Sequence, residues 1–493
     1  MSGLHRVHVR VNDCDTGQPT PVRIRFTGSD GRYYAPLGRA RDFEDALSAV
    51  GIHLYGGNLL IGDRAYAYID GTCEIRLPAG LINVEITKGP EFQPIVEQVN
   101  LAPGKLALRF NIKRWIDLRK NGWYSGDVCA RYLVPHACLL EGAAEDVAVV
   151  NLLAFEESDS VPDTYPNLIA FSGQKLALEM PGHMVVVNTE NRHPMLGSLI
   201  LLNCHRIVFP LYFGKDFDNW TLADWCDQCH RKGGLVISRG SGEALADLIL
   251  GKVDAVQIRP MPREFRPDFY YVLLNSGIRV PLAAGGEKST VKTQIGSTRT
   301  YAYVGREKPL DYQLWIEAMR AGRTFVTYGP LLSFLVNDQP PGDAIQLESS
   351  DQKLHVRAEA RSWSPFGRLQ VIANGLVVAE AACNGSPAVA AIEVEVTMPA
   401  GGWLAARCIH HEDKWPDGEK GALATAHASP VYVRVAGRTP PVETAAVESL
   451  RYDLDETLKW VDEEGRFETE KEKLTLVEIL QSAKQRLLDL NRE

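Results

Sequence analysis

The chain has 493 residues, of which 45% are hydrophobic and 23% are charged, a composition typical of globular proteins. No apolar stretch approaches the roughly 20 residues that a membrane helix needs, so an integral membrane protein is excluded. The net charge of −9 and the lack of a basic run argue against electrostatic nucleic-acid binding. A chain of this length is expected to form roughly two to four domains.

The amino terminus and the cysteines indicate where the protein works. The first residues lead straight into an alternating strand pattern without the apolar segment of a secretory signal, so we expect a cytoplasmic protein. The nine cysteines are scattered from Cys14 to Cys408, which favours reduced thiols over a disulfide framework. We expect no membrane or nucleic-acid partner, and we leave open a small anionic ligand and a homo-oligomer.

The first predicted domain, residues 1–114, reads as a β-sandwich. Apolar residues alternate with polar ones in two early segments, as in Val7-His8-Val9 and Val22-Arg23-Ile24. Such alternation is typical of strands with one buried and one solvated face. Turn dipeptides such as Asp70-Gly71 separate the segments, which favours an antiparallel arrangement.

The pattern of apolar residues changes in residues 115–332, where short unbroken apolar runs alternate with helix-like segments. Unbroken runs are typical of strands buried on both faces, so an α/β domain is predicted. The expected strands are 147–153, 184–187, 199–202, 235–237 and 253–258. The expected helices are 221–232, 243–250 and 311–321, the first and last of which are followed by glycine.

Two further segments complete the predicted organisation. Residues 333–437 alternate again and contain an Asn374-Gly375 hairpin signal, which predicts a second β-sandwich. Residues 438–493 begin with a proline-containing linker and continue as an acidic tail with apolar residues at helical spacing. We expect this helical tail to pack on the rest of the protein or on a partner subunit.

A motif near the start of the α/β segment carries a family resemblance. Residues 121–127 read Asn-Gly-Trp-Tyr-Ser-Gly-Asp and precede Val-Cys-Ala-Arg. The chain here resembles the carbaryl-hydrolase-like (CehA/McbA) metallohydrolases of the polymerase and histidinol phosphatase (PHP) superfamily. These carry Trp-x-Ser-Gly-Asp-x-His-x-His after a small β-domain. The similarity continues through Gly-Gly-Leu-Val at 233–236 and Arg-Ala-Gly-Arg-Thr-Phe-Val-Thr at 320–327.

This resemblance implies a multidomain α/β plus all-β protein. A distorted PHP-like α/β barrel would be flanked by two β-sandwich domains and followed by the helical tail. It also implies a metal centre at the strand ends that activates water for hydrolysis. Most of the ligand positions are nevertheless substituted. Cys129 and Arg131 replace the His-x-His pair, Ser198 replaces a histidine after Gly197, Arg239 replaces another, and Gly286-Glu287 replaces a late Thr-Asp or Ser-Asp pair.

The substitutions argue against the family's metal site. An arginine stays protonated and offers no lone pair, so neither Arg131 nor Arg239 can ligate a divalent cation. We therefore expect no cofactor. A rearranged zinc, manganese or iron site remains an alternative, and its ligands would be Cys129, Glu190, His193 and Glu287.

The same positions suggest a cleft that binds anions. Guanidinium groups form bidentate contacts with phosphate and carboxylate, so Arg131 and Arg239 are candidate ligand-binding residues. The other candidate ligand-binding residues are Asp127, His193, Ser198 and Lys288. Cys129, Glu190 and Glu287 are candidate catalytic residues, with a thiol pKa that two guanidinium groups would depress. The alternative is that the arginines only form salt bridges within a disused site.

Three further patterns carry weaker signals. Cys226-Asp227-Gln228-Cys229-His230 matches the haem-attachment pattern, but helical spacing places both cysteines on one apolar face, where packing is expected. His183 and the pair His410-His411 could ligate a metal but are more often structural. Lys288-Ser289-Thr290 follows two glycines with the wrong spacing for a phosphate-binding loop.

Three functions stay open from the sequence. The favoured hypothesis is a degenerate family member that no longer performs metal-assisted hydrolysis and binds an anionic molecule or a partner in the former active-site cleft. The second is a hydrolase with altered chemistry or a rearranged metal site, acting on an ester, carbamate, phosphate or glycan. The third is a scaffold in which the sandwiches and the tail carry the function.

Overall fold

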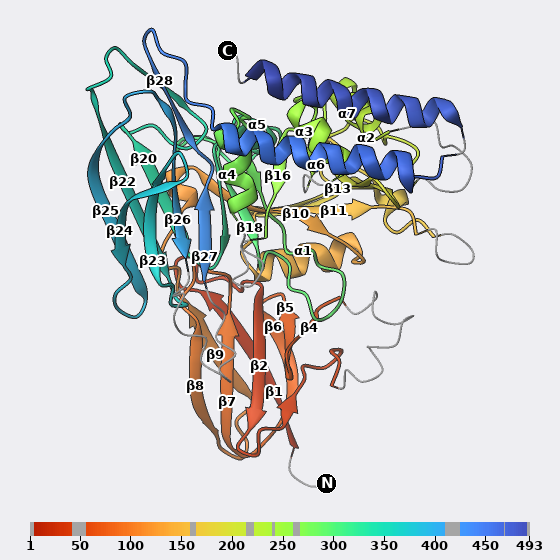
Figure 1. The fold of residues 1–493 in the computed structure, drawn as a ribbon. Coiled ribbons are helices and arrows are strands. Elements are labelled where there is room, and N and C mark those ends of the chain that lie inside the picture. Colours follow the sequence, from red (N-terminus) through yellow and green to blue (C-terminus); the bar gives the residue numbers. More distant parts are fainter. Residues whose placement is uncertain are drawn as a thin grey trace.

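The computed structural model describes residues 4–41, 56–157, 164–212, 221–238, 242–259, 267–409, 424–467 and 469–490. Figure 1 shows a β-sandwich at the amino terminus, a mixed α/β region above it, a second β-rich region beside that, and two long helices near the carboxyl terminus. The coarse prediction of an α/β region between β-rich parts is confirmed.

The first β-sandwich consists of two sheets that share one core. One sheet has the order β6-β1-β9 and the other β4-β5-β2-β7-β8, with β3 on β2. The alternating apolar side chains predicted from the sequence, including Val7, Val9 and Ile24, lie in the common core. The strands are Leu4–Asp13 (β1), Val22–Gly28 (β2), Tyr33–Tyr34 (β3), Asn58–Ile61 (β4), Arg64–Ile69 (β5), Thr72–Pro78 (β6), Gly80–Thr87 (β7), Ile95–Leu101 (β8) and Ala107–Ile112 (β9).

The central region is built on part of a 16-stranded sheet. Strands β10, β11 and β13 pair in parallel, β14 runs antiparallel to its neighbours, and β15, β16 and β17 pair in parallel again. The strands are Trp123–Ala130 (β10), Val149–Ala154 (β11), Leu178–Met180 (β12), His183–His193 (β13), Gly197–Leu202 (β14), Leu235–Ser238 (β15), Ala255–Gln257 (β16), Leu282–Ala283 (β17), Arg299–Tyr303 (β18) and Thr324–Tyr328 (β19). The helices are Pro135–Ala144 (α1), Leu222–Arg231 (α2), Glu243–Ile249 (α3), Asp268–Asn275 (α4) and Tyr312–Arg320 (α5), with 3-10 turns at Arg119–Asn121 and Leu168–Ala170.

The central sheet curls into a half-barrel. Its far strand β17 returns toward β18 and β19, where side chains join the strands. Thr300 donates to the carbonyl of Ala284 at 2.9 Å, and Thr324 donates to the carbonyl of Leu282 at 2.9 Å. No backbone ladder links β17 to β18 or β19 among the described residues. The structure therefore supports a curled half-barrel and does not establish the closed barrel that the resemblance implies.

The second β-rich region shares its sheet with the central region. Strand β27 pairs with β19 through Phe325 and Ala428, so the large sheet continues across the predicted boundary at residue 332. A separate sheet, β20-β22-β25, packs on the same core. The strands are Leu331–Val336 (β20), Ala344–Leu347 (β21), Lys353–Ser362 (β22), Arg368–Ala373 (β23), Leu376–Ala382 (β24), Ala388–Thr397 (β25), Gly402–Ile409 (β26), Thr425–Ala428 (β27) and Val431–Val435 (β28).

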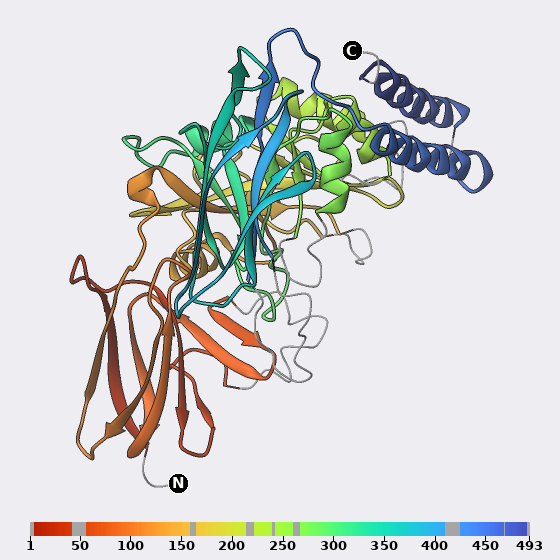
Figure 2. The same ribbon diagram turned by 60° about the vertical axis from the view of Figure 1, so that its left-hand side comes forward.

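The tail forms two helices, Thr444–Glu463 (α6) and Glu470–Leu490 (α7). Figures 1 and 2 show them side by side over the helices of the central region. Their apolar residues, such as Leu450 and Leu480, share a core with Leu245 and Leu273 of α3 and α4. The expectation that the tail packs on the protein is confirmed. None of the described helices is long and apolar enough to cross a membrane.

The weaker sequence patterns have structural explanations. Cys226 and Cys229 lie on the buried face of α2, as helical spacing predicts. His183 is buried, and its Nδ1 lies 2.9 Å from the carbonyl oxygen of Val147. Burial, followed by the cationic Arg119 and Lys88, lowers the pKa of His183 to about 3, so the ring is neutral. His410 and His411 lie outside the described residues.

Candidate functional site

Several of the predicted site residues lie at the carboxyl ends of the parallel strands of the half-barrel. Asp127 and Cys129 are on β10, and Arg131 directly follows that strand. Glu190 is on β13, and Glu287 follows β17. Ligands of open α/β sheets bind beyond these strand ends, because the loops there converge. The sequence thus places its candidate residues where an α/β fold builds a site.

Glu190 is held by two arginines. Arg131 Nε lies 2.6 Å from Glu190 Oε2, and Arg131 Nη2 lies 2.8 Å from Oε1, which makes a bidentate pair. Arg192, two residues along the same strand, donates to Oε2 at 2.9 Å. Burial alone would raise the pKa of Glu190, but the two guanidinium groups outweigh it and hold that pKa below its ordinary value. Glu190 is therefore an anion that neutralises most of the charge of Arg131.

Glu287, which follows β17, forms a second ion pair with Arg259. Gln257, the last residue of β16, donates to Glu287 Oε1 at 3.1 Å, and Arg259 Nε donates to the same oxygen at 3.1 Å. Glu287 has a positive φ of 52°, a conformation uncommon for residues other than glycine. This backbone conformation, which glutamate seldom adopts, turns the side chain of Glu287 toward Arg259.

Cys129 lies beneath the two ion pairs and is fully buried. The pairing of β10 with β11 shifts register between Asp127 and Ala130, so Cys129 falls within a bulge of the strand. Burial raises the pKa of Cys129 well above its ordinary value, and this outweighs the lowering by Arg131, while Glu190 and Glu287 raise it further. The depressed pKa expected from the sequence is wrong, because the prediction counted the arginines and not the burial.

The Cys129 thiol is therefore expected to resist alkylation. A thiol that is protonated and shielded from solvent reacts slowly, because the thiolate is the nucleophile. In native protein treated with iodoacetamide at neutral pH, the exposed Cys14 should be modified first and Cys129 only after unfolding. Peptide mass spectrometry measures both sites in one sample. Modification of Cys129 at the rate of Cys14 would contradict this structure and revive the nucleophile hypothesis.

Asp127 has a structural role. Its Oδ1 accepts from the amide of Cys129 at 2.8 Å, and its Oδ2 accepts from the amides of Gly286 and Gly296 at 3.0 and 2.7 Å. The residue has no exposed surface. Burial raises the pKa of Asp127, although all three amide contacts favour the carboxylate. Asp127 thus fixes the loop after β17 against β10, and three backbone amides occupy the carboxylate that the sequence assigned to ligand binding.

Lys288 is directed away from the ion pairs, toward helix α1. Its Nζ lies 3.0 Å from Glu141 Oε2, and both side chains are almost completely buried. The contact is an ion pair without good hydrogen-bond alignment. The backbone carbonyl of Lys288 accepts from the amide of Arg131 at 2.7 Å, which ties the loop to the end of β10. The charge of Lys288, which the sequence assigned to a ligand site, is therefore already used by Glu141.

His193 and Ser198 lie on the adjacent strand pair. Ser198 is opposite Arg192 in the pairing of β13 with β14, so the two side chains belong to the same face of the sheet. His193 is the last residue of β13, and its Nδ1 accepts from the amides of Met195 and Leu196 at 3.2 and 3.0 Å. Side chains alternate along a strand, so His193 and Glu190 belong to opposite faces of the sheet. Arg239 lies outside the described residues.

Sequence reasoning missed three charged residues of this region: Arg192, Arg259 and Glu141. Two signals were available. Arg192 follows Glu190 by two positions, a spacing that places both on one face if the predicted strand 184–187 continues through them. Arg259 directly follows the predicted strand 253–258, at the end where a site was expected. Nothing in the sequence points to Glu141 as the partner of Lys288, because the two residues are 147 positions apart.

The donor set does not fit the metal that the resemblance implies. Both oxygens of Glu190 face guanidinium groups, and Glu287 is occupied by Arg259 and Gln257. The Nδ1 lone pair of His193 is used by backbone amides. Within the described ranges, no three histidine, cysteine, aspartate or glutamate side chains group as metal ligands. A metal there would have to displace at least two arginines.

Comparisons with known proteins identify no relative. No family model, no curated protein and no solved structure matches this chain. The site has therefore to be interpreted from its own geometry, and the family remains a matter of resemblance.

Proposed function

We propose that this protein is a non-hydrolytic relative of the CehA/McbA-like metallohydrolases that binds a small anion at the strand ends of the half-barrel. The arginine cluster, defined as Arg131, Arg192 and Arg259 with Glu190 and Glu287, carries the proposal. Three guanidinium groups and two carboxylates make up this cluster, so positive groups outnumber negative ones among these five residues. A small anion is expected to be attracted to them.

The exposures within the cluster indicate which arginines would meet the ligand. The Arg131 and Glu190 side chains are only 11% and 5% exposed, and they satisfy one another. The Arg192 side chain is 29% exposed and that of Arg259 is 38% exposed, so both can be reached from solvent. Arg192 also lies over the ring of Phe155, 4.3 Å from its centroid, which restricts its orientation. Arginines held in place in this way lose little freedom on binding a phosphate or carboxylate group.

The absence of metal-assisted hydrolysis is the second half of the proposal. It rests on the chemistry of the substitutions, because arginine cannot act as a metal ligand. It also rests on the two glutamates, whose oxygens are taken by cations of the protein itself. The proposal thus retains the hypothesis of a degenerate family member that the sequence favours. The expected ligand contacts are now Arg192 and Arg259 in place of Arg131.

Binding of inorganic phosphate and of citrate tests the anion site. A ligand present at 100 times its dissociation constant adds about 2.7 kcal/mol to the free energy of unfolding, which thermal melting detects. We expect stabilisation that is lost in both Arg192→Gln and Arg259→Gln. Arg323→Gln is the matched control, because Arg323 is 45% exposed and forms a similar ion pair with Asp343 elsewhere. Equal stabilisation of all three variants, or none of the unsubstituted protein, would refute the anion site.

The metal content of the purified protein tests the proposal that it does not perform metal-assisted hydrolysis. Protein purified without a histidine tag or chelator should contain far less than one equivalent of zinc, manganese or iron by elemental mass spectrometry. Near-stoichiometric metal that disappears in Glu190→Gln would instead establish the rearranged metal site and favour the hydrolase hypothesis.

A further inference from the structure

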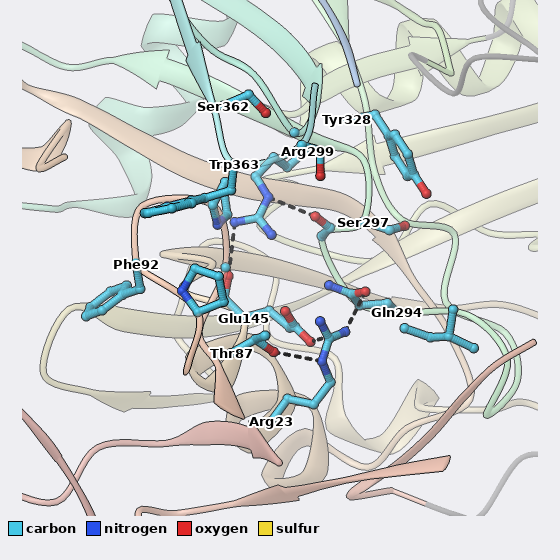
Figure 3. Close-up of a pocket in the computed structure, with 17 residues that line it drawn as sticks. Arg23, Thr87, Phe92, Glu145, Gln294, Ser297, Arg299, Tyr328, Ser362 and Trp363 are labelled. Atoms are coloured by element: carbon cyan, nitrogen blue, oxygen red, sulfur yellow. Dashed lines mark hydrogen bonds and ion pairs between the residues drawn. The ribbon is translucent and has the colours of Figure 1, made fainter. Parts of the chain in front are cut away.

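Two interior features lie apart from the arginine cluster. The first is a pocket of about 350 Å³ between the first β-sandwich and the half-barrel (Figure 3). Its charged groups are already engaged, because Arg23 pairs with Glu145 at 3.1 Å and Arg299 donates to the Glu145 carbonyl at 3.0 Å. The second feature is a pair of neighbouring thiols, Cys204 and Cys229, which has a chemistry of its own.

The sulfur atoms of Cys204 and Cys229 are in contact. They lie 3.4 Å apart, and both side chains are buried. Cys204 follows β14 and Cys229 is in the last turn of α2, so the fold brings together two thiols that are 25 positions apart in the chain. Both thiols are free in this structure, and either can donate the hydrogen bond between them.

The surrounding backbone holds the two thiols in place. The amide of His205 donates to the carbonyl of Lys232 at 3.0 Å, and the amide of Gly234 donates to the carbonyl of Cys229 at 2.9 Å. Gly234 also packs directly on both sulfurs, because a Cβ atom at this position would lie 2.4 Å from each of them. A residue with a side chain does not fit there without displacing the sulfurs, so the two sulfurs share one confined space.

The segment between the two cysteines supports the arginine cluster. The side-chain amide of Asn191 donates to the carbonyls of Val208 and Pro210 at 2.8 and 2.9 Å. The backbone amide of Arg192 donates to the carbonyl of Leu211 at 2.9 Å. A covalent link between the thiols would therefore tie the start of the segment that lies beside Arg192 to helix α2.

We propose that Cys204 and Cys229 form a disulfide bond by exchange with a small disulfide such as glutathione disulfide. One protein thiolate attacks glutathione disulfide and releases one glutathione, and the second attacks the resulting mixed disulfide and releases the other. The two protein thiols are oxidised, glutathione disulfide is reduced by the same two electrons, and the two thiol protons end on the two glutathione molecules. This modification site does not depend on the proposed anion site.

The exchange takes place in molecules that have opened locally. In the closed protein both thiols are shielded, and the hydrogen bond to Cys204, followed by burial, raises the pKa of Cys229 well above its ordinary value. The reagent meets a thiolate only when α2 moves away from the end of β14. When the protein closes again, its packing returns the two sulfurs to contact. This favours the bond within the protein over a mixed disulfide with glutathione.

Peptide mapping of the full chain tests this proposal. The reduced protein is incubated with glutathione disulfide in urea below the unfolding midpoint, which increases the opened fraction, and is then denatured and treated with N-ethylmaleimide. We expect peptides linked through Cys204 and Cys229, while the exposed Cys14 carries glutathione and shows that the reagent was active. The oxidised protein should unfold at a higher urea concentration than the reduced protein, because the link restricts the unfolded chain.

Two variants and two alternative results make the test specific. Cys229→Ala should lose both the link and the gain in stability. Cys226→Ala is the matched control and should keep both, because Cys226 is buried one turn earlier on the same helix. If Cys14 is modified while Cys204 and Cys229 stay reduced or each carry glutathione, the proposal is wrong. It is also wrong if the oxidised protein is no more stable than the reduced one, because the packing would then not accommodate the bond. Mapping of the unsubstituted protein decides the question even where a variant fails to fold.

Discussion

Replacing Asp127 by alanine is expected to lower the free energy of unfolding by about 5 kcal/mol. The substitution leaves the amides of Cys129, Gly286 and Gly296 without an acceptor in a site that water does not reach. Each buried amide that loses its partner costs roughly 1–3 kcal/mol. Chemical denaturation monitored by circular dichroism measures the change.

Two further variants make this result specific. Asp127→Asn keeps one carbonyl oxygen and should fall between the parent protein and Asp127→Ala. Asp70→Ala removes an exposed carboxylate that also accepts a backbone amide, from Thr72 at 3.2 Å, and should remain close to the parent. If Asp127→Ala were as stable as Asp70→Ala, the three-amide anchor would not exist and Asp127 would be free to act as a ligand residue.

Breaking the Glu141–Lys288 pair is expected to cost about 3–5 kcal/mol, the usual effect of leaving one charge buried alone. Glu141 also accepts the amide of Gly57 at 2.8 Å, so this pair joins the first sandwich to the half-barrel. Lys288→Met removes the cation and keeps the side-chain length, and it should show the full loss in denaturant titration. Glu141→Gln should show a similar loss.

The double variant tests whether the loss of stability comes from a buried charge that has lost its partner. Glu141→Gln with Lys288→Met removes both charges, and it should be more stable than the Lys288→Met single variant. The Lys353–Glu395 pair is the control, because its side chains are 63% and 60% exposed and its removal should leave stability unchanged. A double variant that loses the sum of both single effects would show that the ion pair has no energetic coupling.

Local signals in the sequence predicted about half of the elements of the central region. The helix expected at 221–232 is α2, where Thr221 caps the first turn by accepting from the amide of Asp224. The helix expected at 311–321 is α5, capped by Asp311. The Asn374-Gly375 turn adopts φ values of 47° and 85°, as such hairpin turns require. Helix caps and hairpin turns depend on residues that are close together in the chain, so a short stretch of sequence is enough to predict them.

Long-range pairing could not be predicted in the same way. The sequence divided the chain at residue 332, but β19 pairs with β27 about a hundred residues later. Strand periodicity shows that a segment is a strand and not which strand lies beside it. The helical tail shows the same limit. Its apolar face predicted that the tail packs against another surface, but the sequence did not indicate that this surface is formed by α3 and α4.

The sequence indicated which charged residues lie together at the strand ends, and only partly how they are paired. Cys129, Arg131, Glu190 and Glu287 do lie together at the strand ends. Lys288 and Asp127 do not contribute there, because their partners are Glu141 and three backbone amides. Burial decided the state of Cys129, and burial cannot be read from charge patterns alone. The exposure of Arg192 and Arg259, on which the proposed anion site depends, likewise cannot be read from the sequence.

The large sheet that passes from the half-barrel into the second β-rich region has a consequence for cooperativity. If residues 115–332 were expressed alone, β19 would lose its partner β27 and expose a row of unpaired backbone groups. The two regions should therefore unfold together, as a single thermal transition, and a cut between them should destabilise both. A ligand bound at the arginine cluster would then also protect the second β-rich region against proteolysis.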